Sequence, residues 1–378
     1  MIAELPADSF ERLRPLLPQP CIHLAVESIL VGATPARVFV DQAEQPRSAL
    51  AWSKNHFFLA GDPVNPGFNQ DLNTLFTETI YPQRQADGGV MLELFPLTGG
   101  DSSEVTAQAM SILAGKDPLP DRREVYRFEA FKQDWRAMLP REMALVLVTQ
   151  ALIDQKNLTH MDDLTEELVS EHPSVASFLE KSFGVALIAG LTPIESTTLA
   201  GWCLSEYNLP GRCEVGIETV DGYRKRGLGT LLGSALVAEA QARGIHQVSW
   251  HCFAWNTASS ATARKIGFTQ TANYPIYFAW YHPASNLAVH GNIYLSLGQY
   301  PASLEWFEKS LALLDAPAWV DWGAGCACAR LNDLSSAISH LEQAIAKGFT
   351  HKALFQNSPH LDGLRGAPAW DALMEKLT

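Results

Sequence analysis

Residues 213–268 read CEVGIETVDGYRKRGLGTLLGSALVAEAQARGIHQVSWHCFAWNTASSATARKIGF and decide the fold of the chain. An alternating run over 213–220 predicts a strand, which a basic, glycine-punctuated turn joins to an amphipathic helix ending at Gly244. A second strand over 247–253 and a second helix ending at Gly267 follow. A strand that meets a helix through a glycine turn leaves backbone N–H groups free in the first helical turn, where the helix dipole favours an anion. The stretch therefore predicts an α/β layer with a pocket for a phosphate group.

The composition is that of an ordinary globular protein, with 378 residues, 47% hydrophobic and 18% charged, which indicates two or three domains. The formal net charge of −13 argues against nucleic acid as a partner, because nucleic-acid binding rests on Lys and Arg at phosphates. No stretch approaches the roughly 20 apolar residues that a membrane helix needs. The N-terminus lacks the apolar segment of a signal peptide. We therefore expect a cytoplasmic protein with no membrane partner.

The cysteines are scattered and form no C-x-x-C pair. Cys326 and Cys328 are the only close pair, and they stand in a helical pattern. We interpret them as buried thiols rather than as a metal or redox site. The sequence therefore predicts no metal site.

Residues 1–135 predict a first α/β domain. Strands are expected at 36–41, 49–62 and 90–95, with helices at 69–81 and 102–113. This order resembles that of the later stretch, but no basic glycine turn precedes the first of the two helices. One interpretation is a degenerate copy of the later fold that lacks the phosphate pocket.

From 284 to 378 the pattern is helical only, and an internal repeat appears. Gly291, Ser303 and Phe307 are followed one repeat later by Gly325, Ala337 and Leu341. Small residues recur where paired helices pack closely. The spacing is similar to that of the tetratricopeptide repeat, whose period is about 34 residues. The resemblance implies an all-α helical-repeat domain that could bind a protein partner.

The stretch 143–282 carries a resemblance to a known family. Arg224-x-x-Gly227-x-Gly229 follows a strand, and Asn256 leads through a helix to Gly267-Phe268. This resembles the GNAT-superfamily N-acetyltransferases, in the subgroup that includes the zwittermicin-resistance acetyltransferase. The resemblance implies a GNAT-type mixed central sheet flanked by helices over 136–283, with acetyl-CoA as the co-substrate.

The resemblance also implies where coenzyme A binds. Gly227 and Gly229 would let the backbone approach the pyrophosphate, and basic side chains would add charge-assisted hydrogen bonds. The alternative for this turn is a solvated loop that caps a helix, and the alternative for Asn256 is a helix N-cap. The residues expected to bind the cofactor are Thr219, Val220, Arg224, Lys225, Arg226, Gly227, Leu228, Gly229, Thr230, Asn256 and Ser259.

Acyl transfer to an amine requires a base that takes the proton of the attacking nitrogen. Glu214 and Glu218 share one face of the first strand. Glu214 stands where several acetyltransferases of the superfamily keep a glutamate base, and Glu218 is the second candidate. The alternative for Glu214 is a carboxylate that only attracts a cationic substrate.

The general acid is less clear from the sequence. Many relatives place a tyrosine four residues before the Gly-Phe pair, where this chain has Ala263. Tyr277 and Tyr274 are the substitutes for it, and Tyr277 is the first candidate. His251 lies in mid-strand and is interpreted as a packed histidine.

Two functions remain open. The first is an acetyl-CoA-dependent N-acetyltransferase that moves the acetyl group directly to a primary amine of a small molecule. The second is a catalytically weak or inactive coenzyme A-binding module that acts as an interaction protein through its helical repeats. The intact phosphate pocket favours the first, and the absent tyrosine favours the second. Acceptor specificity is expected in loops at 155–182, 191–197 and 207–212.

Overall fold

The computed structural model describes residues 2–18, 23–98, 100–155, 157–190 and 197–377. The chain forms two compact units. The first comprises residues 1–71, 94–109 and 120–277, and the second comprises residues 72–93, 110–119 and 278–378.

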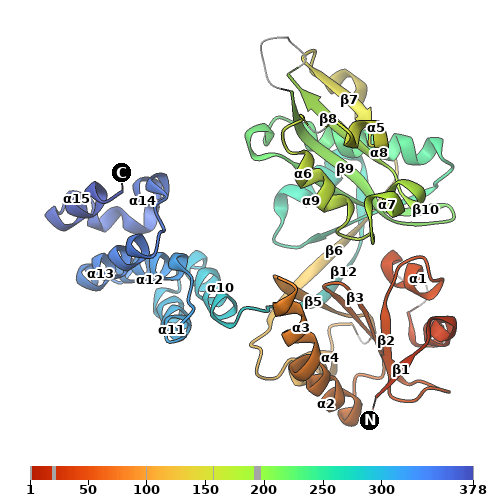
Figure 1. Cartoon of the computed structure of the whole chain (residues 1–378), viewed down its shortest axis with the longest axis horizontal. Coiled ribbons are helices and arrows are strands. Elements are labelled where there is room, and N and C mark those ends of the chain that lie inside the picture. The colour runs from red at the N-terminus through yellow and green to blue at the C-terminus, as the bar shows by residue number, and fades with distance from the viewer. Residues whose placement is uncertain (1, 19–22, 99, 156, 191–196, 378) are drawn as a thin grey trace. The chain divides into compact units, whose positions relative to one another are not determined.

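The first unit is built on one mixed sheet flanked by helices, which confirms the predicted fold class (Figure 1). The strands lie in the order β1-β2-β3-β4-β5-β12-β6-β11-β10-β9-β8-β7. Their bounds are β1 (Ala3–Leu5), β2 (Arg37–Val40), β3 (Ser48–Ser53), β4 (His56–Gly61), β5 (Met91–Pro96), β6 (Leu119–Phe128), β7 (Met143–Leu147), β8 (Gly184–Ala189), β9 (Thr198–Leu209), β10 (Arg212–Thr219), β11 (Gln247–Phe253) and β12 (Phe268–Trp280).

The N-terminal part of this unit contains the strands and helices that the sequence predicts. The expected strand at 49–62 is the β3–β4 hairpin, which turns at Lys54 with a positive φ of 52°. Every residue of β3 is buried. The helices here are η1 (Ala7–Leu16), α1 (Leu24–Leu30), α2 (Pro66–Leu75) and α4 (Ser103–Ile112). The η1 and α1 side chains share an apolar core with Val125, Tyr207 and Ile276, which come from the later strands.

The C-terminal part of this unit holds residues 213–268. β7, β8, β9 and β10 pair antiparallel, and β10 then pairs parallel with β11. The helices are α5 (Gln150–Ile153), α6 (Met161–Leu168), α7 (Val175–Lys181), α8 (Leu228–Ala242) and α9 (Thr257–Ile266). Leu232, Leu236, Trp250 and Ile266 form the centre of the core under α8 and α9.

Two of the three expected specificity loops are largely regular structure. The segment 155–182 folds mainly as α6 and α7, and 207–212 is the turn of the β9–β10 hairpin. Of the third, 191–197, only Thr197 is among the described residues.

The second unit is helical where the sequence predicts helices. Its elements include the helical turn η2 (Phe76–Ile80), α3 (Tyr81–Ala86), α10 (Pro283–Ser296), α11 (Tyr300–Leu311), α12 (Ala318–Arg330), α13 (Leu334–Ala346), α14 (Lys352–Asn357), η5 (Pro359–Leu364) and α15 (Pro368–Glu375). Phe307 lies against Gly291 and Gly323, where an added Cβ would come within 2.8 and 2.4 Å of its ring. Gly325 meets Leu341 in the same way, at 2.8 Å. The close packing at small residues is therefore confirmed, and the resemblance to tetratricopeptide repeats stays a prediction.

The described cysteines are buried, as expected from the sequence. Burial raises the pKa of the Cys326 thiol to about 12 and that of Cys328 to about 11, so both are inert thiols at neutral pH. Cys21 lies outside the described residues. Among the helices that the structure describes, none combines the length and apolar character required to cross a membrane.

Gly267 is required where α9 turns into β12, and this can be tested. Its φ is 128°, and a Cβ would lie 1.7 Å from the Ala130 carbonyl oxygen. We expect Gly267→Ala to cost about 3 kcal/mol, which combines an unfavourable φ with a clash against backbone. That corresponds to a fall of at least about 6 °C in the melting temperature.

The matched control is Gly32→Ala. Gly32 also has a positive φ of 73°, but nothing lies within 4 Å of the added Cβ. Equal melting temperatures for the two variants would contradict the proposed clash.

Candidate active site

The strand β10 is paired along both edges only in its first half. Its parallel ladder with β11 runs from Arg212–Gln247 to Val215–Trp250, whereas its antiparallel ladder with β9 continues to Thr219–Gly201. A β-bulge between Glu214 and Val215 marks the change. Past Val215 the two parallel strands part, so backbone groups of β10 on that edge are open to pair with a ligand.

The helix α8 begins beside this opening. Gly227 precedes it with a φ of 79°, a left-handed conformation that glycine adopts without strain. No side chain caps the start of α8, and its first turn carries no acidic residue. The N–H groups and the dipole of this 15-residue helix are therefore available to an anion.

A cleft of about 630 Å³ lies between the opening in the sheet and the start of α8. Most of the residues predicted to bind the cofactor line it, namely Thr219, Arg224, Lys225, Gly227, Leu228, Gly229, Thr230, Asn256 and Ser259. Val220 lines a neighbouring hollow instead, and the Arg226 guanidinium stacks on the Tyr223 ring.

Three of these residues already have protein partners. Arg224 forms ion pairs with Glu218 at 2.8 Å and with Asp221 at 2.6 Å, and its Nε donates to the Thr219 carbonyl at 2.8 Å. Asn256 is the N-cap of α9, since its Oδ1 accepts from the Ser259 N–H at 3.0 Å. The Ser259 hydroxyl accepts from the Trp250 indole N–H at 2.9 Å. These bonds fix the wall of the cleft.

The sequence analysis did not identify some residues that line the cleft. Trp255 is 65% exposed and stacks on Phe253, and Lys265 and Thr262 face the cleft from α9. An aromatic residue directly before a helix N-cap was the available signal for Trp255. A flat, exposed ring at this place is suited to stack on a base or to cover an acyl chain.

Glu214 lies at the β-bulge and is only 2% exposed. Burial raises the pKa of its carboxyl group to about 7, with a further upward contribution from Glu171, while Arg123 and a hydrogen bond from the Leu24 backbone oppose the rise. Its Oε2 is buried without a hydrogen-bond partner in the described structure. A carboxylate with a pKa near neutrality is suited to accept a proton.

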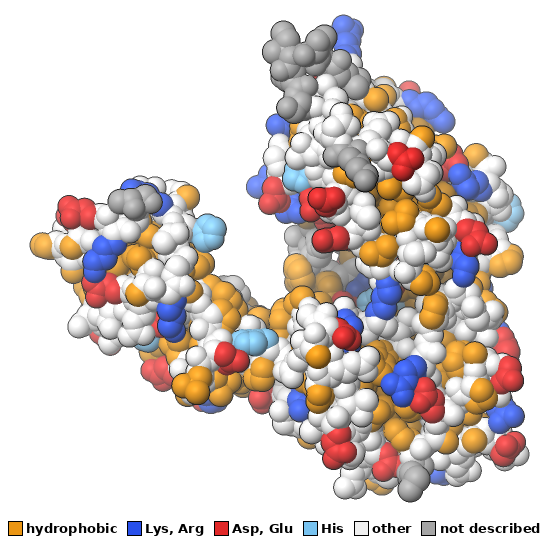
Figure 2. Space-filling model, in the orientation of Figure 1, with side chains coloured by type: hydrophobic (Ala, Val, Ile, Leu, Met, Phe, Trp, Pro, Cys, Tyr) orange, Lys and Arg blue, Asp and Glu red, His pale blue; other side chains and the backbone are white. Residues whose placement is uncertain are grey.

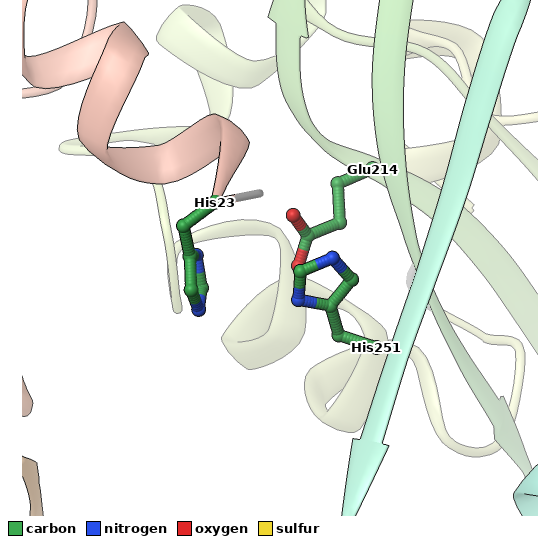
Figure 3. A group of neighbouring side chains, drawn as sticks. All are labelled: His23, Glu214 and His251. Atoms are coloured by element: carbon green, nitrogen blue, oxygen red, sulfur yellow. The ribbon is translucent and has the colours of Figure 1, made fainter. Parts of the chain in front are cut away.

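His251 and His23 face Glu214 from β11 and from the residue that precedes α1 (Figure 3). His251 Nδ1 lies 3.5 Å from Glu214 Oε1. Burial lowers the pKa of His251 to about 3 and moves that of His23 in the same direction, so both rings are neutral at pH 7. Sequence reasoning identified His251 only as a packed residue and gave no role to His23.

These three side chains are also a conceivable metal site. One potential ligand atom from each lies within 4.8 Å of the others, and two histidines with a glutamate are a common donor set for zinc. Arg123 opposes this use, because its positive charge lowers the pKa of His23, His251 and Glu214 alike. The same field repels a bound cation.

A sequence-family model described as GNAT acetyltransferase matches residues 16–277, which is more than half of the chain. The chain belongs to this family. GNAT acetyltransferases take their acetyl group from acetyl-CoA, and the cleft beside α8 is where the predicted cofactor residues meet.

Two relatives illustrate the similarity. The chain is 24% identical over 281 residues to the uncharacterized N-acetyltransferase YdfB of Bacillus subtilis, an alignment that covers 74% of this chain and 99% of that protein. A GCN5-related N-acetyltransferase-like protein from Streptococcus suis matches in structure with a TM-score of 0.53 and 19% identity, covering 72% of this chain and 99% of that one. In both cases the similarity spans nearly the whole relative.

The remaining candidate residues from the sequence lie in different places. Glu218 is partly exposed and lines the cleft. The structure does not bring Tyr277 to the cleft, since its ring is buried and its hydroxyl donates to Thr106 Oγ1 at 3.0 Å. Ala263 is fully buried in the core. Tyr274 is buried, and the centroid of its ring lies 6.4 Å from that of the His251 ring.

Gly229 provides a test of the coenzyme cleft in this GNAT protein. A Cβ at Gly229 would meet Thr219, Thr262 and Ile217 at 3.6–3.8 Å, which is ordinary contact, so the fold itself has room for it. We expect Gly229→Ala to leave stability unchanged or to raise it by up to about 1 kcal/mol, since alanine favours a helix. Acetyl-CoA affinity should fall at least about tenfold by isothermal titration calorimetry.

The matched control is Gly67→Ala, because Gly67 is likewise the second residue of a helix and has nothing within 4 Å of its Cβ position. Unchanged acetyl-CoA affinity in Gly229→Ala would place the coenzyme elsewhere.

Proposed function

We propose that the protein transfers the acetyl group of acetyl-CoA directly to a primary amine of a small molecule, with Glu214 as the general base. The observation that carries this proposal is the buried Glu214 carboxyl group, which has a pKa of about 7 and lies where β10 parts from β11. The parting is next to the wall that would hold the acetyl–pantetheine arm, at Thr219.

The acetyl group moves from sulfur to nitrogen without a covalent enzyme intermediate. The substrate ammonium gives one proton to Glu214 through water and becomes a neutral amine. Its nitrogen forms a bond to the thioester carbonyl carbon, and the C–S bond breaks with its electron pair leaving on sulfur. The thiolate takes the second proton of the nitrogen and leaves as coenzyme A, while Glu214 returns its proton to solvent. A thiol is a good leaving group with a pKa of about 8.5, so the step does not require Tyr277 as an acid.

Acetyl transfer should depend on pH through Glu214. The base acts when deprotonated, so we expect kcat/KM to rise with pH and to level off above about pH 7, well below the titration of a free alkyl amine. Glu214→Gln should lower kcat by about 10²-fold or more, and the rise of kcat/KM with pH below about pH 7 should disappear. The measurement is thiol release across pH with a panel of primary amines.

The control for the base is Glu218→Gln, since Glu218 is the second candidate on the same strand. Under this proposal the rise of kcat/KM with pH up to about pH 7 persists in Glu218→Gln. If that rise is lost in Glu218→Gln but kept in Glu214→Gln, Glu218 is the base. Absence of thiol release with every amine, despite acetyl-CoA binding, would favour the alternative of a coenzyme A-binding interaction protein.

We further propose that transfer needs no metal ion. The support is the field of Arg123 at the cluster of His23, Glu214 and His251, which opposes a cation there. We expect protein dialysed against EDTA to keep its rate of thiol release. A loss of activity that added zinc restores would overturn this part of the proposal.

A further inference from the structure

Glu206 carries a carboxyl group that the proposed mechanism does not use. It is the extra residue of β9 at the β-bulge, since the ladder with β10 passes from Tyr207 directly to Ser205. A bulge releases its extra residue from the regular pairing, and here the Glu206 side chain turns over β10. A Cβ built on Gly216 would lie 1.7 Å from Glu206 Oε1. The carboxyl group of a β9 residue therefore occupies the space of a side chain at residue 216 of β10.

This space is next to the open edge of β10. The N–H of Val220 donates to β9 at 3.0 Å. Backbone groups of an antiparallel strand alternate in direction, so the N–H groups of Ile217 and Thr219 point away from β9, to the edge where β10 has parted from β11. Both residues line the coenzyme cleft. Because Gly216 precedes Ile217, the Glu206 carboxyl group lies one residue from an N–H that is open to a ligand.

Glu206 and the proposed base share one face of β10. Residues 214 and 216 alternate onto the same face, and residues two apart along a strand are about 6.6 Å apart. Glu214 is only 2% exposed and lies against His251 and His23 (Figure 3). The Glu206 side chain is partly exposed, so it is the more accessible of the two carboxyl groups.

The surroundings of Glu206 favour its protonated form. Burial raises the pKa of Glu206 well above its ordinary value. Three carboxylates raise it further and one guanidinium opposes them, namely Glu171, Glu214, Glu167 and Arg123. Glu167 belongs to α6, and acidic side chains gather over the part of the surface where α6 lies (Figure 2). A carboxyl group among like charges is most stable as the neutral acid, which has an O–H to donate.

No protein group uses this donor in the described part of the chain, where the Glu206 carboxyl group has neither a hydrogen bond nor an ion pair. When an amine adds to a thioester, the carbonyl oxygen becomes an oxyanion, and donors held beside it lower the barrier. A carboxylic acid that stays protonated in an enzyme site is suited to this task. The open N–H of Ile217 is a second donor at the same place.

We infer that Glu206 is a further catalytic residue, whose carboxyl group donates a hydrogen bond to the carbonyl oxygen of the acetyl thioester, beside the N–H of Ile217. This inference rests on the proposed function, since it adds a residue to the same acetyl transfer. Glu206 keeps its proton throughout. The C=O double bond opens to C–O⁻ as the nitrogen adds, and it forms again as the C–S bond breaks and its electron pair leaves on sulfur. Glu214 remains the group that accepts the proton of the amine.

The direct test is the infrared band of the thioester carbonyl. Acetyl-CoA labelled with ¹³C at the carbonyl carbon is bound to the full-length protein without an acceptor amine, so that no acetyl group is transferred. A hydrogen bond to the oxygen lowers the stretching frequency. We expect the band at higher frequency in Glu206→Ala than in the wild type. In Glu206→Gln it should stay close to the wild-type position, because the glutamine amide still donates.

Gly216→Ala tests the same contact with the carboxyl group intact. The three atoms nearest to the added Cβ all belong to the flexible Glu206 side chain, which must move away. We expect this variant to show the band position of Glu206→Ala. The matched control is Glu180→Ala, the same substitution at an exposed glutamate of α7, and its band should stay at the wild-type position.

Turnover gives an independent measurement. Loss of one oxyanion donor lowers kcat by about 10²–10³-fold, so Glu206→Ala and Gly216→Ala should release thiol at least about 10²-fold more slowly. Glu206→Gln should stay within about tenfold of the wild type, since it keeps a donor. A carboxylate that accepts a proton or binds an ammonium group would instead be lost equally in both Glu206 variants. Equal losses in Glu206→Gln and Glu206→Ala, or one band position in all variants, would overturn the inference.

The two measurements separate this inference from the proposed function. If the wild type releases thiol and the carbonyl band does not respond to Glu206→Ala, acetyl transfer stands and the role of Glu206 fails. If no amine supports thiol release, the proposed function fails, and the carbonyl band still decides whether Glu206 bonds to the thioester.

Discussion

The parting of β10 from β11 after Val215 is the constraint on which the site depends. Up to that residue both edges of β10 are satisfied, and beyond it only β9 remains as a partner. Open backbone groups inside a sheet are costly, so the arrangement is stable only if a ligand or water pairs with them. The β-bulge in the β9–β10 ladder, at Glu214 and Val215, lies at the same point of the strand. The bulge also places Glu206 over Gly216, on the face of β10 that carries Glu214.

The N-terminal part of the first unit surrounds the proposed base Glu214 although it lacks a glycine turn. It supplies His23 beside Glu214, the Leu24 backbone bond to that carboxylate, and Arg123 from β6. The apolar core around η1 and α1 removes Glu214 from solvent, and burial is the largest cause of its raised pKa. The pKa of the proposed base would therefore be set by a part of the chain that has no phosphate pocket.

The sequence predicted the local part of this site well and the tertiary part poorly. The turn from Arg224 to Gly229 and the cap at Asn256 are short-range patterns, so strand and helix periodicity located them. Glu206 was missed because only the β-bulge of β9 brings its side chain over Gly216 of β10. Tyr277 was chosen by residue type alone, and its side chain is directed to Thr106. The ion pairs of Arg224 could not be predicted either, because the sequence does not show which way the Glu218 and Asp221 side chains are oriented.

Amide hydrogen exchange with and without acetyl-CoA tests the central claim most directly, since it reports on the backbone groups themselves. The account predicts that saturating acetyl-CoA slows exchange at the amides of residues 216–219 that face away from β9 and at those of Leu228 and Gly229, where β10 is open and α8 begins. Little change is expected at the amides of residues 212–215, where β10 pairs with both β9 and β11. Protection confined to other segments, or none at saturation, would contradict the claim that the parted strand and the start of α8 form the coenzyme site.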